Sequence, residues 1–354
     1  MLHGPRGLCR GHGEHHAGHQ GRTQHHPRRT QLLPQGNGVG GETMKARVST
    51  DWLSGCSGCH VAMVDLHEKL LGLVEEVDFV RVPVLMDEKE YPRADVGIVE
   101  GAVRSDHDRV ALEKMRASVD KLIAFGTCAV YGGPSGLGWL HEREDVMAAI
   151  YDGGPTNAGG ERPDSDAPTL EDSVVPIDEV VEVDAYLPGC PPHPYFIAAG
   201  LRAVLGVSDL KLTSMSVCAD CDRKMQKNEG VEFRRGEVTA EKDSLCFLSQ
   251  GVVCLGSVTL NRCQAPCPQS GIACFGCAGP SVDLITEPHL DLRNLIGRRF
   301  NMLTGIPTDE VTRYFEEDAK TLYAYAVASP VIHGKPTVEM REWAGPKAAA
   351  QGGK

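Results

Sequence analysis

Apolar residues follow two alternating patterns between residues 44 and 207. Short runs such as KARVSTDWL, ADVGIVEGAV, KLIAFGTCAV and VVEVDAYLP are typical of buried strands. The segments 60–74, 106–118 and 194–206 have the apolar spacing of helices, with Ser105 or Asp106 as the cap of the second. Strands that alternate with helices in this way predict a doubly wound parallel sheet.

The pattern changes on both sides of this region. Residues 132–180 are rich in Gly, Pro and Asp and predict a surface excursion from the sheet. From 208 to 290 cysteines replace the apolar periodicity, and 291–354 predict a helical tail with a disordered end. Residues 1–43 hold many His, Gly and Arg but no apolar run longer than two residues, so we expect a disordered or mis-assigned extension.

Charge and hydropathy exclude some classes of partner. The net charge of -12 argues against a nucleic-acid surface. No run of about 18 apolar residues occurs, so we expect no transmembrane segment in this chain. Arg28 and Arg29 are not followed by a hydrophobic region before Met44, which argues against a twin-arginine export signal.

The cysteines give the strongest chemical signal. There are 13, and all but Cys9 follow residue 44. A large chain with apolar strands is unlike a small secreted disulfide scaffold, so this many clustered cysteines favour metal ligation in a reducing compartment such as the cytoplasm. Scattered buried thiols are the less favoured interpretation.

One group of four cysteines follows the predicted strands: Cys56, Cys59, Cys128 and Cys190. In a doubly wound sheet the loops after the strands emerge along one carboxyl edge, so these thiols are expected to meet there. Zinc usually takes two CxxC pairs, and only one occurs here, so we favour a [4Fe-4S] cluster. A redox-active CxxC would leave two of the four unused.

The remaining eight cysteines divide by spacing into two further quartets. The first comprises Cys218, Cys221, Cys246 and Cys254. The second comprises Cys263, Cys267, Cys274 and Cys277. Cys254 and Cys263 are near each other in sequence and could trade places between the quartets. Twelve cysteines suit three cubane clusters, which would also stabilise a segment with little aliphatic core.

Four segments resemble a known family. WLSGCSGCH, VEGAV, FGTCAVYGG and LPGCPP, within residues 52–192, are similar to the signature segments of [NiFe] hydrogenase small subunits. The all-cysteine C-terminal region is most similar to the soluble group 3 type, the methyl-viologen-reducing and sulfhydrogenase small subunits. The resemblance implies an α/β chain: a flavodoxin-like doubly wound domain (44–207), an irregular two-cluster iron-sulfur domain (208–290) and a helical tail (291–354).

The same resemblance implies an electron-transfer role with no catalytic residue in this chain. The sheet-edge quartet would hold the proximal cluster, the first C-terminal quartet the distal cluster and the second the medial one. Many relatives have a [3Fe-4S] medial cluster, whereas the full quartet here predicts [4Fe-4S]. The Ni-Fe centre would belong to a large-subunit partner, and electrons would leave to an acceptor subunit or protein. We expect a higher-order oligomer in the cytoplasm, either free or held at a membrane by its partners.

Two other functions stay open. A quinone-reducing subunit of the complex I type shares the fold, but it typically has adjacent cysteines in place of CSGC and lacks the eight later ligands. A structural zinc protein would hold a few zinc ions instead of about twelve irons.

Several neighbouring residues have structural or interface interpretations. For Glu100 we favour a buried acid that accepts backbone hydrogen bonds over a group that moves protons. His60 and His193 flank cluster ligands and are expected to support them or to face a partner. Arg298 and Arg299 are interpreted as surface residues that could pair with a partner's acids.

Overall fold

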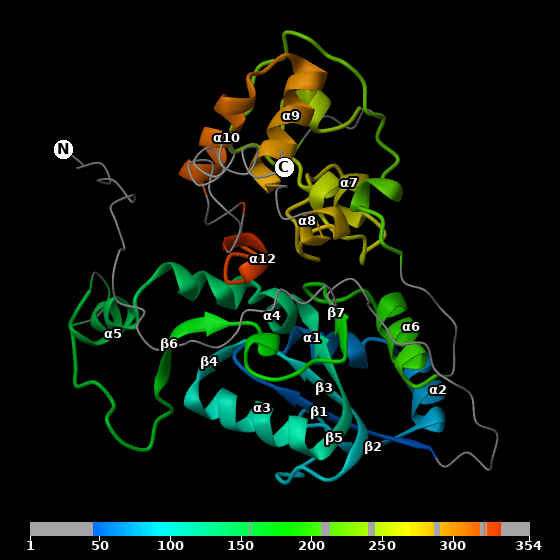
Figure 1. Ribbon diagram of the computed structural model, residues 1–354, viewed down its shortest axis with the longest axis vertical. Coiled ribbons are helices and arrows are strands. Elements are labelled where there is room, and N and C mark those ends of the chain that lie inside the picture. Colours follow the sequence, from blue (N-terminus) through cyan, green and yellow to red (C-terminus); the bar gives the residue numbers. More distant parts are fainter. Residues whose placement is uncertain are drawn as a thin grey trace, which may run out of the picture.

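The computed structural model describes residues 45–154, 156, 158–206, 213–239, 245–286, 291–318, 322 and 324–333. The predicted extension 1–43, with Cys9, and the end of the tail lie outside these residues. Figure 1 shows the sheet and its helices as one part, with the cysteine-rich loops and helices α9 and α10 as a second part. The short helix α12 (Pro330–His333) lies between the two.

A parallel five-stranded sheet forms the centre of the first part. Its strand order is β2-β1-β3-β5-β7. The strands are β1 (Ala46–Trp52), β2 (Val77–Arg81), β3 (Ala94–Glu100), β5 (Val119–Phe125) and β7 (Ala185–Leu187). All four pairings are parallel. This is the flavodoxin-like doubly wound order, so the predicted fold class is confirmed.

Helices cover both faces of the sheet. On one face α1 (Gly58–Val64), α2 (Glu68–Glu76) and α6 (Pro194–Val204) share a core with the sheet. On the other face the core includes α3 (Asp106–Ser118) and α4 (Gly126–Tyr131). Strands buried on both faces explain the continuous apolar runs in the sequence.

The helix predicted over 60–74 is two helices. α1 ends at Val64, and His67, with φ of 51°, turns the chain before α2 begins at Glu68. No Gly or Pro marks this break. β2 covers only the first part of the apolar run VDFVRVPVL, because Pro83 in that run cannot donate to a ladder.

The predicted surface excursion contains ordered elements. These are η2 (Pro134–Leu140), α5 (Arg143–Tyr151), β6 (Leu170–Val175) and η3 (Ile177–Glu179). β6 pairs antiparallel with β4 (Val103–Ser105) in a second, two-stranded sheet. The sequence of β6 shows no apolar strand pattern, because only Val174 on this strand is buried and several of its other residues are polar.

The second part consists mainly of loops and short helices. They are η4 (Val217–Ala219), η5 (Leu248–Gln250), η6 (Gly256–Val258), α7 (Pro266–Gln269) and α8 (Val282–Thr286). α9 (Leu292–Thr304) and α10 (Thr308–Glu317) pack on them through Phe300 and Phe315, which are fully buried with Phe247 and Leu248. The cysteine-rich loops therefore share one apolar core with these helices.

α10, in the predicted helical tail, has Pro307 at its N-cap position and ends at Glu317. Tyr314 packs edge-on against Phe233, at 5.5 Å between ring centroids. Among the described residues no helix is long and apolar enough to cross a membrane.

Candidate metal centres

The carboxyl ends of four parallel strands lie in one row. Trp52 pairs with Glu100, Glu100 with Phe125, and Phe125 with Leu187. The loops and turns that follow three of these strands carry the sheet-edge cysteines. The alignment of the strand ends therefore brings residues from distant parts of the sequence to one edge, as the spacing predicts.

The four sheet-edge thiols lie within electrostatic reach of each other. Burial raises the pKa of Cys59 well above its usual range, and the charges of Cys128 and Cys190 raise it further. Burial also raises the pKa of Cys190 to about 12, with added contributions from Cys128 and Cys56. Thiols that disfavour each other's ionisation form a site that a cation-containing group would stabilise.

Glycines make room beside these sulfurs. A Cβ on Gly126 would lie 2.3 Å from the Cys59 Sγ, and one on Gly133 would lie 2.5 Å from the Cys128 Sγ. Both glycines have positive φ, 83° and 55°. At these two positions only backbone lies beside the ligand sulfurs, which leaves room for an inorganic group.

Glu100 and His60 form a buried polar network under the CxxC turn. One Glu100 carboxylate oxygen accepts the Cys59 backbone N–H at 3.0 Å, and the other lies 2.5 Å from His60 Nδ1. His60 Nε2 lies 2.9 Å from the Thr50 hydroxyl. Glu100 thus has the predicted role of a buried hydrogen-bond acceptor, and His60 supports the turn through it.

His193 has a different local role. Its Nδ1 accepts the backbone N–H of Tyr195 at 3.2 Å and so caps α6. This cap fixes the start of the helix that follows the Cys190 loop.

The first C-terminal quartet also forms a group of coupled thiols. Burial raises the pKa of Cys218 to about 11, and the charges of Cys246 and Cys221 add to the shift. Burial raises the pKa of Cys254 to about 12, with contributions from Cys246 and Cys218. The four residues grouped by spacing are therefore neighbours in space.

The second C-terminal quartet is also a group of coupled thiols, and it lies near both the first C-terminal quartet and the sheet-edge quartet. Burial raises the pKa of Cys277 to about 11, and Cys263 and Cys267 raise it further. Burial raises the pKa of Cys274 strongly, with Cys254 as the next cause and Cys277 after it. The backbone N–H of Cys274 also donates to the Cys254 Sγ at 3.3 Å. This quartet therefore lies between the other two.

The donor set fits an iron-sulfur cluster better than a single metal ion. Four sulfurs about 2.3 Å from one zinc ion would lie about 3.8 Å apart. In the described part of the chain no three His, Cys, Asp or Glu side chains lie close enough to hold one metal ion. Each thiolate of a cubane binds a different iron, so the four sulfurs need not converge on one ion, and the glycine-lined space and all-sulfur donors suit that group.

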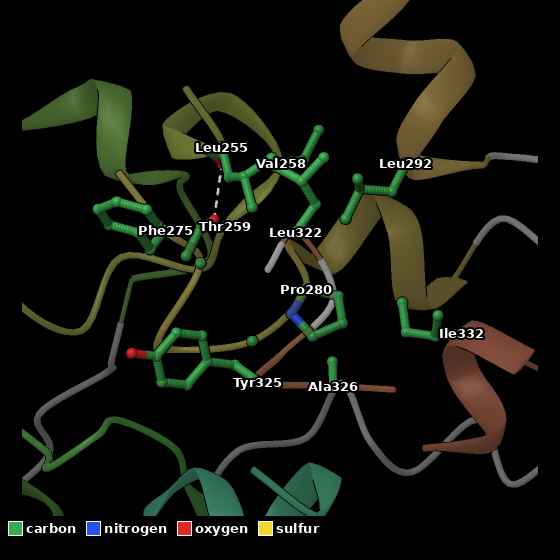
Figure 2. A pocket seen from close by; sticks show the side chains of 12 residues that line it. Leu255, Val258, Thr259, Phe275, Pro280, Leu292, Leu322, Tyr325, Ala326 and Ile332 are labelled. Atoms are coloured by element: carbon green, nitrogen blue, oxygen red, sulfur yellow. Dashed lines mark hydrogen bonds between the residues drawn. The ribbon is translucent and has the colours of Figure 1, made fainter. Parts of the chain in front are cut away.

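Two further residues lie beside the quartets, and one of them, Arg299, was interpreted from sequence as a surface residue. The Arg299 guanidinium donates to the Ser257 carbonyl at 2.9 Å, and its charge lowers the pKa of Cys218, so it lies beside the first quartet and not on a free surface. Tyr325, from the segment that precedes α12, lines a small apolar pocket with Gly276 and Pro280 (Figure 2). Burial raises its pKa, and the nearby charges of Cys190 and Cys277 raise it further.

Thr127 connects the two parts of the molecule. Its hydroxyl donates to the Cys277 carbonyl at 2.5 Å and accepts the Gly189 N–H at 2.9 Å. Its position beside a cysteine is the only sequence signal for this role.

The comparisons with known proteins agree with this arrangement. The family model described as NADH ubiquinone oxidoreductase, 20 Kd subunit, matches residues 56–204. One subunit of the F420-non-reducing hydrogenase of Methanothermobacter marburgensis is 35% identical over 81% of this chain and 96% of the relative. One vhu subunit of the F420-non-reducing hydrogenase of Methanocaldococcus jannaschii is 38% identical over 71% of this chain and 85% of the relative.

A solved structure is also similar in part. The crystal structure of an NAD+-reducing [NiFe]-hydrogenase in the H2-reduced state matches 48% of this chain and 96% of its own, at 34% identity and a TM-score of 0.45. The sequence relatives, which this chain matches over most of their length, decide the assignment. This chain belongs to the family of hydrogenase small, electron-transferring subunits.

Proposed function

We propose that the chain relays electrons from H2 oxidation through three [4Fe-4S] clusters. The proximal cluster would be held by Cys56, Cys59, Cys128 and Cys190. The distal cluster would be held by Cys218, Cys221, Cys246 and Cys254. The medial cluster would be held by Cys263, Cys267, Cys274 and Cys277. The chemistry supplied by such clusters is one-electron transfer.

The chain's own residues would keep these centres dry and correctly spaced. Cys254 and Cys274 are each 8% exposed, which limits access of water and oxygen. The backbone N–H of Cys274 donates to the Cys254 sulfur at 3.3 Å and lowers its pKa against the effect of burial. Such donors stabilise the thiolate form that a cluster needs.

The partner that supplies electrons would be a large subunit with the Ni-Fe centre. Beside the proximal quartet, α1 and α2 expose Val61, Leu71 and Val74, which are 52%, 69% and 45% exposed. Apolar side chains on one side of a sheet domain are suited to a subunit interface. An acceptor subunit or protein would receive the electrons at the distal quartet, where Cys218 is exposed.

The observation that carries the proposal is the meeting of four cysteines from three distant segments at one sheet edge. The test is to purify the chain with its natural partners under anaerobic conditions. We expect about twelve irons per chain, with sulfide. We also expect a nickel-containing partner and H2-dependent viologen reduction. Purification without any nickel-containing partner and without viologen reduction would contradict the proposal.

A second candidate is a quinone reductase subunit of the complex I type. The match of residues 56–204 to the 20 Kd subunit model favours it. That match ends before the eight C-terminal cysteines, which this candidate leaves unexplained. Side-by-side assays of H2-dependent reduction of viologen, NAD and quinone distinguish the two, because a complex I-type subunit would show no H2-dependent activity.

The assembly is expected to be a higher-order oligomer in the cytoplasm, with any membrane contact made by partners. Gel filtration of the purified complex checks the first expectation. Fractionation of cell extracts at low and high salt checks the second, because peripheral contacts are salt-sensitive.

A further inference from the structure

The proximal and medial quartets approach each other at Cys190 and Cys277. Cys190 belongs to the proximal quartet and Cys277 to the medial one. The N–H of Gly189, which precedes Cys190, and the carbonyl of Cys277 both hydrogen-bond to the Thr127 hydroxyl. The two thiols are also near enough for the charge of Cys277 to add to the rise that burial causes in the pKa of Cys190. A path from one site to the other can therefore pass directly between these two ligands.

Thr127 holds both ends of this contact. Its hydroxyl accepts the N–H of Gly189, the residue before Cys190, at 2.9 Å. The same hydroxyl donates to the carbonyl of Cys277 at 2.5 Å. The Thr127 backbone N–H also donates to the Gly189 carbonyl, at 2.9 Å. One side chain thus links three cysteine-bearing loops.

The surroundings of Thr127 fix the orientation of its side chain. It is 1% exposed and lies in the first turn of α4, directly before Cys128. A buried hydroxyl with one donated and one accepted hydrogen bond is fixed in orientation. Tyr131, on the same helix, packs so closely on Gly279 that a Cβ there would lie 2.1 Å from the ring. The loop that carries Cys277 is therefore pressed against α4 at two points.

We propose that Thr127 is a positioning residue that sets the electron-transfer contact between Cys190 and Cys277. The inference rests on the proposed function. In the step concerned, one electron leaves the proximal site, which is oxidised, and enters the medial site, which is reduced; no bond is formed and no proton is needed. Thr127 touches neither the substrate nor the Ni-Fe centre, and acts only by fixing the two ligand loops.

The test uses the complete complex with Thr127→Val, which keeps the shape but loses both hydrogen bonds of the hydroxyl. We expect full iron content, unchanged H/D exchange at the large subunit, and a several-fold loss in H2-dependent viologen reduction. The magnetic interaction between the proximal and medial clusters in EPR should weaken. Thr127→Ser keeps the hydroxyl and should restore both properties.

Thr304→Val is a matched control. Thr304 is also buried, donates to the Phe300 carbonyl at 2.7 Å and accepts the Ile306 N–H at 3.2 Å, but it lies on α9. The Thr304→Val substitution should leave electron transfer and the magnetic interaction between the proximal and medial clusters unchanged.

Two results would overturn the inference. One is a fully loaded Thr127→Val complex with wild-type viologen reduction and wild-type magnetic interaction. The other is loss of iron from Thr127→Val with retention in Thr127→Ser, which would show that the hydroxyl is needed for cluster retention and not for coupling. If the wild-type complex shows no H/D exchange, that result would instead count against the proposed function itself.

Discussion

At the residue scale, the sites depend on the absence of side chains at neighbouring glycines as much as on the cysteines. Gly126 and Gly133 occupy positions where any side chain would collide with a ligand sulfur. Glu100 has the opposite role, since it fills a buried space and satisfies the Cys59 N–H. Ligand geometry at the sheet edge is thus set by neighbours that themselves bind no metal.

Gly126→Ala tests this dependence. The new methyl group would lie 2.3 Å from the Cys59 Sγ, and the residue would have to keep a φ of 83°. We expect loss of the proximal cluster, about four of the twelve irons, with the other two quartets still loaded. Iron and sulfide analysis with EPR measures this.

Gly72→Ala is the control for that substitution. Gly72 lies within α2 with open space around its Cβ position, so alanine should keep all irons and stabilise the helix by up to about 1 kcal/mol. Equal iron content in the two variants would contradict the role given to Gly126.

At the element scale, the N-cap of α3 is connected to a ligand-bearing loop. α3 starts with a reciprocal capping box between Ser105 and Asp108. The Asp108 carboxylate also accepts the Ser54 hydroxyl at 2.8 Å, and Ser54 lies two residues before Cys56. The cap of α3 is therefore tied to the CxxC loop.

Ser105→Ala should destabilise the protein without removing a cluster ligand. Loss of an N-cap costs about 1 kcal/mol. We expect a melting temperature about 2–4 °C lower, measured anaerobically on the loaded protein. Ser118→Ala, at the other end of α3, removes a hydroxyl that only donates to the Met115 carbonyl and should have a smaller effect. Equal shifts in both variants would count against the capping role.

Much at this scale could be predicted from sequence. The main strands of the parallel sheet, the α3 boundaries and the convergence of Cys56, Cys128 and Cys190 follow from apolar patterns and from the rule that parallel strands end at one edge. The break at His67, the pairing of β6 and the contacts of Thr127 could not be predicted. They depend on tertiary neighbours that leave no periodic or compositional signal.

At the scale of the whole molecule, the two parts differ in what stabilises them. The sheet part has apolar cores on both faces of five strands. The loop-rich part has one core, which it shares with α9 and α10. It also contains eight cysteines, and burial raises the thiol pKa of six of them. Bound clusters should therefore contribute more to the folding of the second part.

Removal of iron with a chelator under anaerobic conditions should affect the two parts unequally. We expect protease cleavage to appear first within residues 213–286, while the sheet strands stay protected. Limited proteolysis followed by mass spectrometry measures this. Simultaneous cleavage in both parts, or no change after iron removal, would contradict the unequal dependence on clusters.

We propose that this chain carries electrons from H2 through three [4Fe-4S] clusters. EPR of the purified complex, titrated with H2 and quantified in spins per chain, can test both the clusters and the role. We expect H2-dependent signals from three reduced [4Fe-4S] clusters in this chain. A [3Fe-4S] signal of one centre per chain would contradict the cluster assignment, and the absence of any H2-dependent signal would contradict the function.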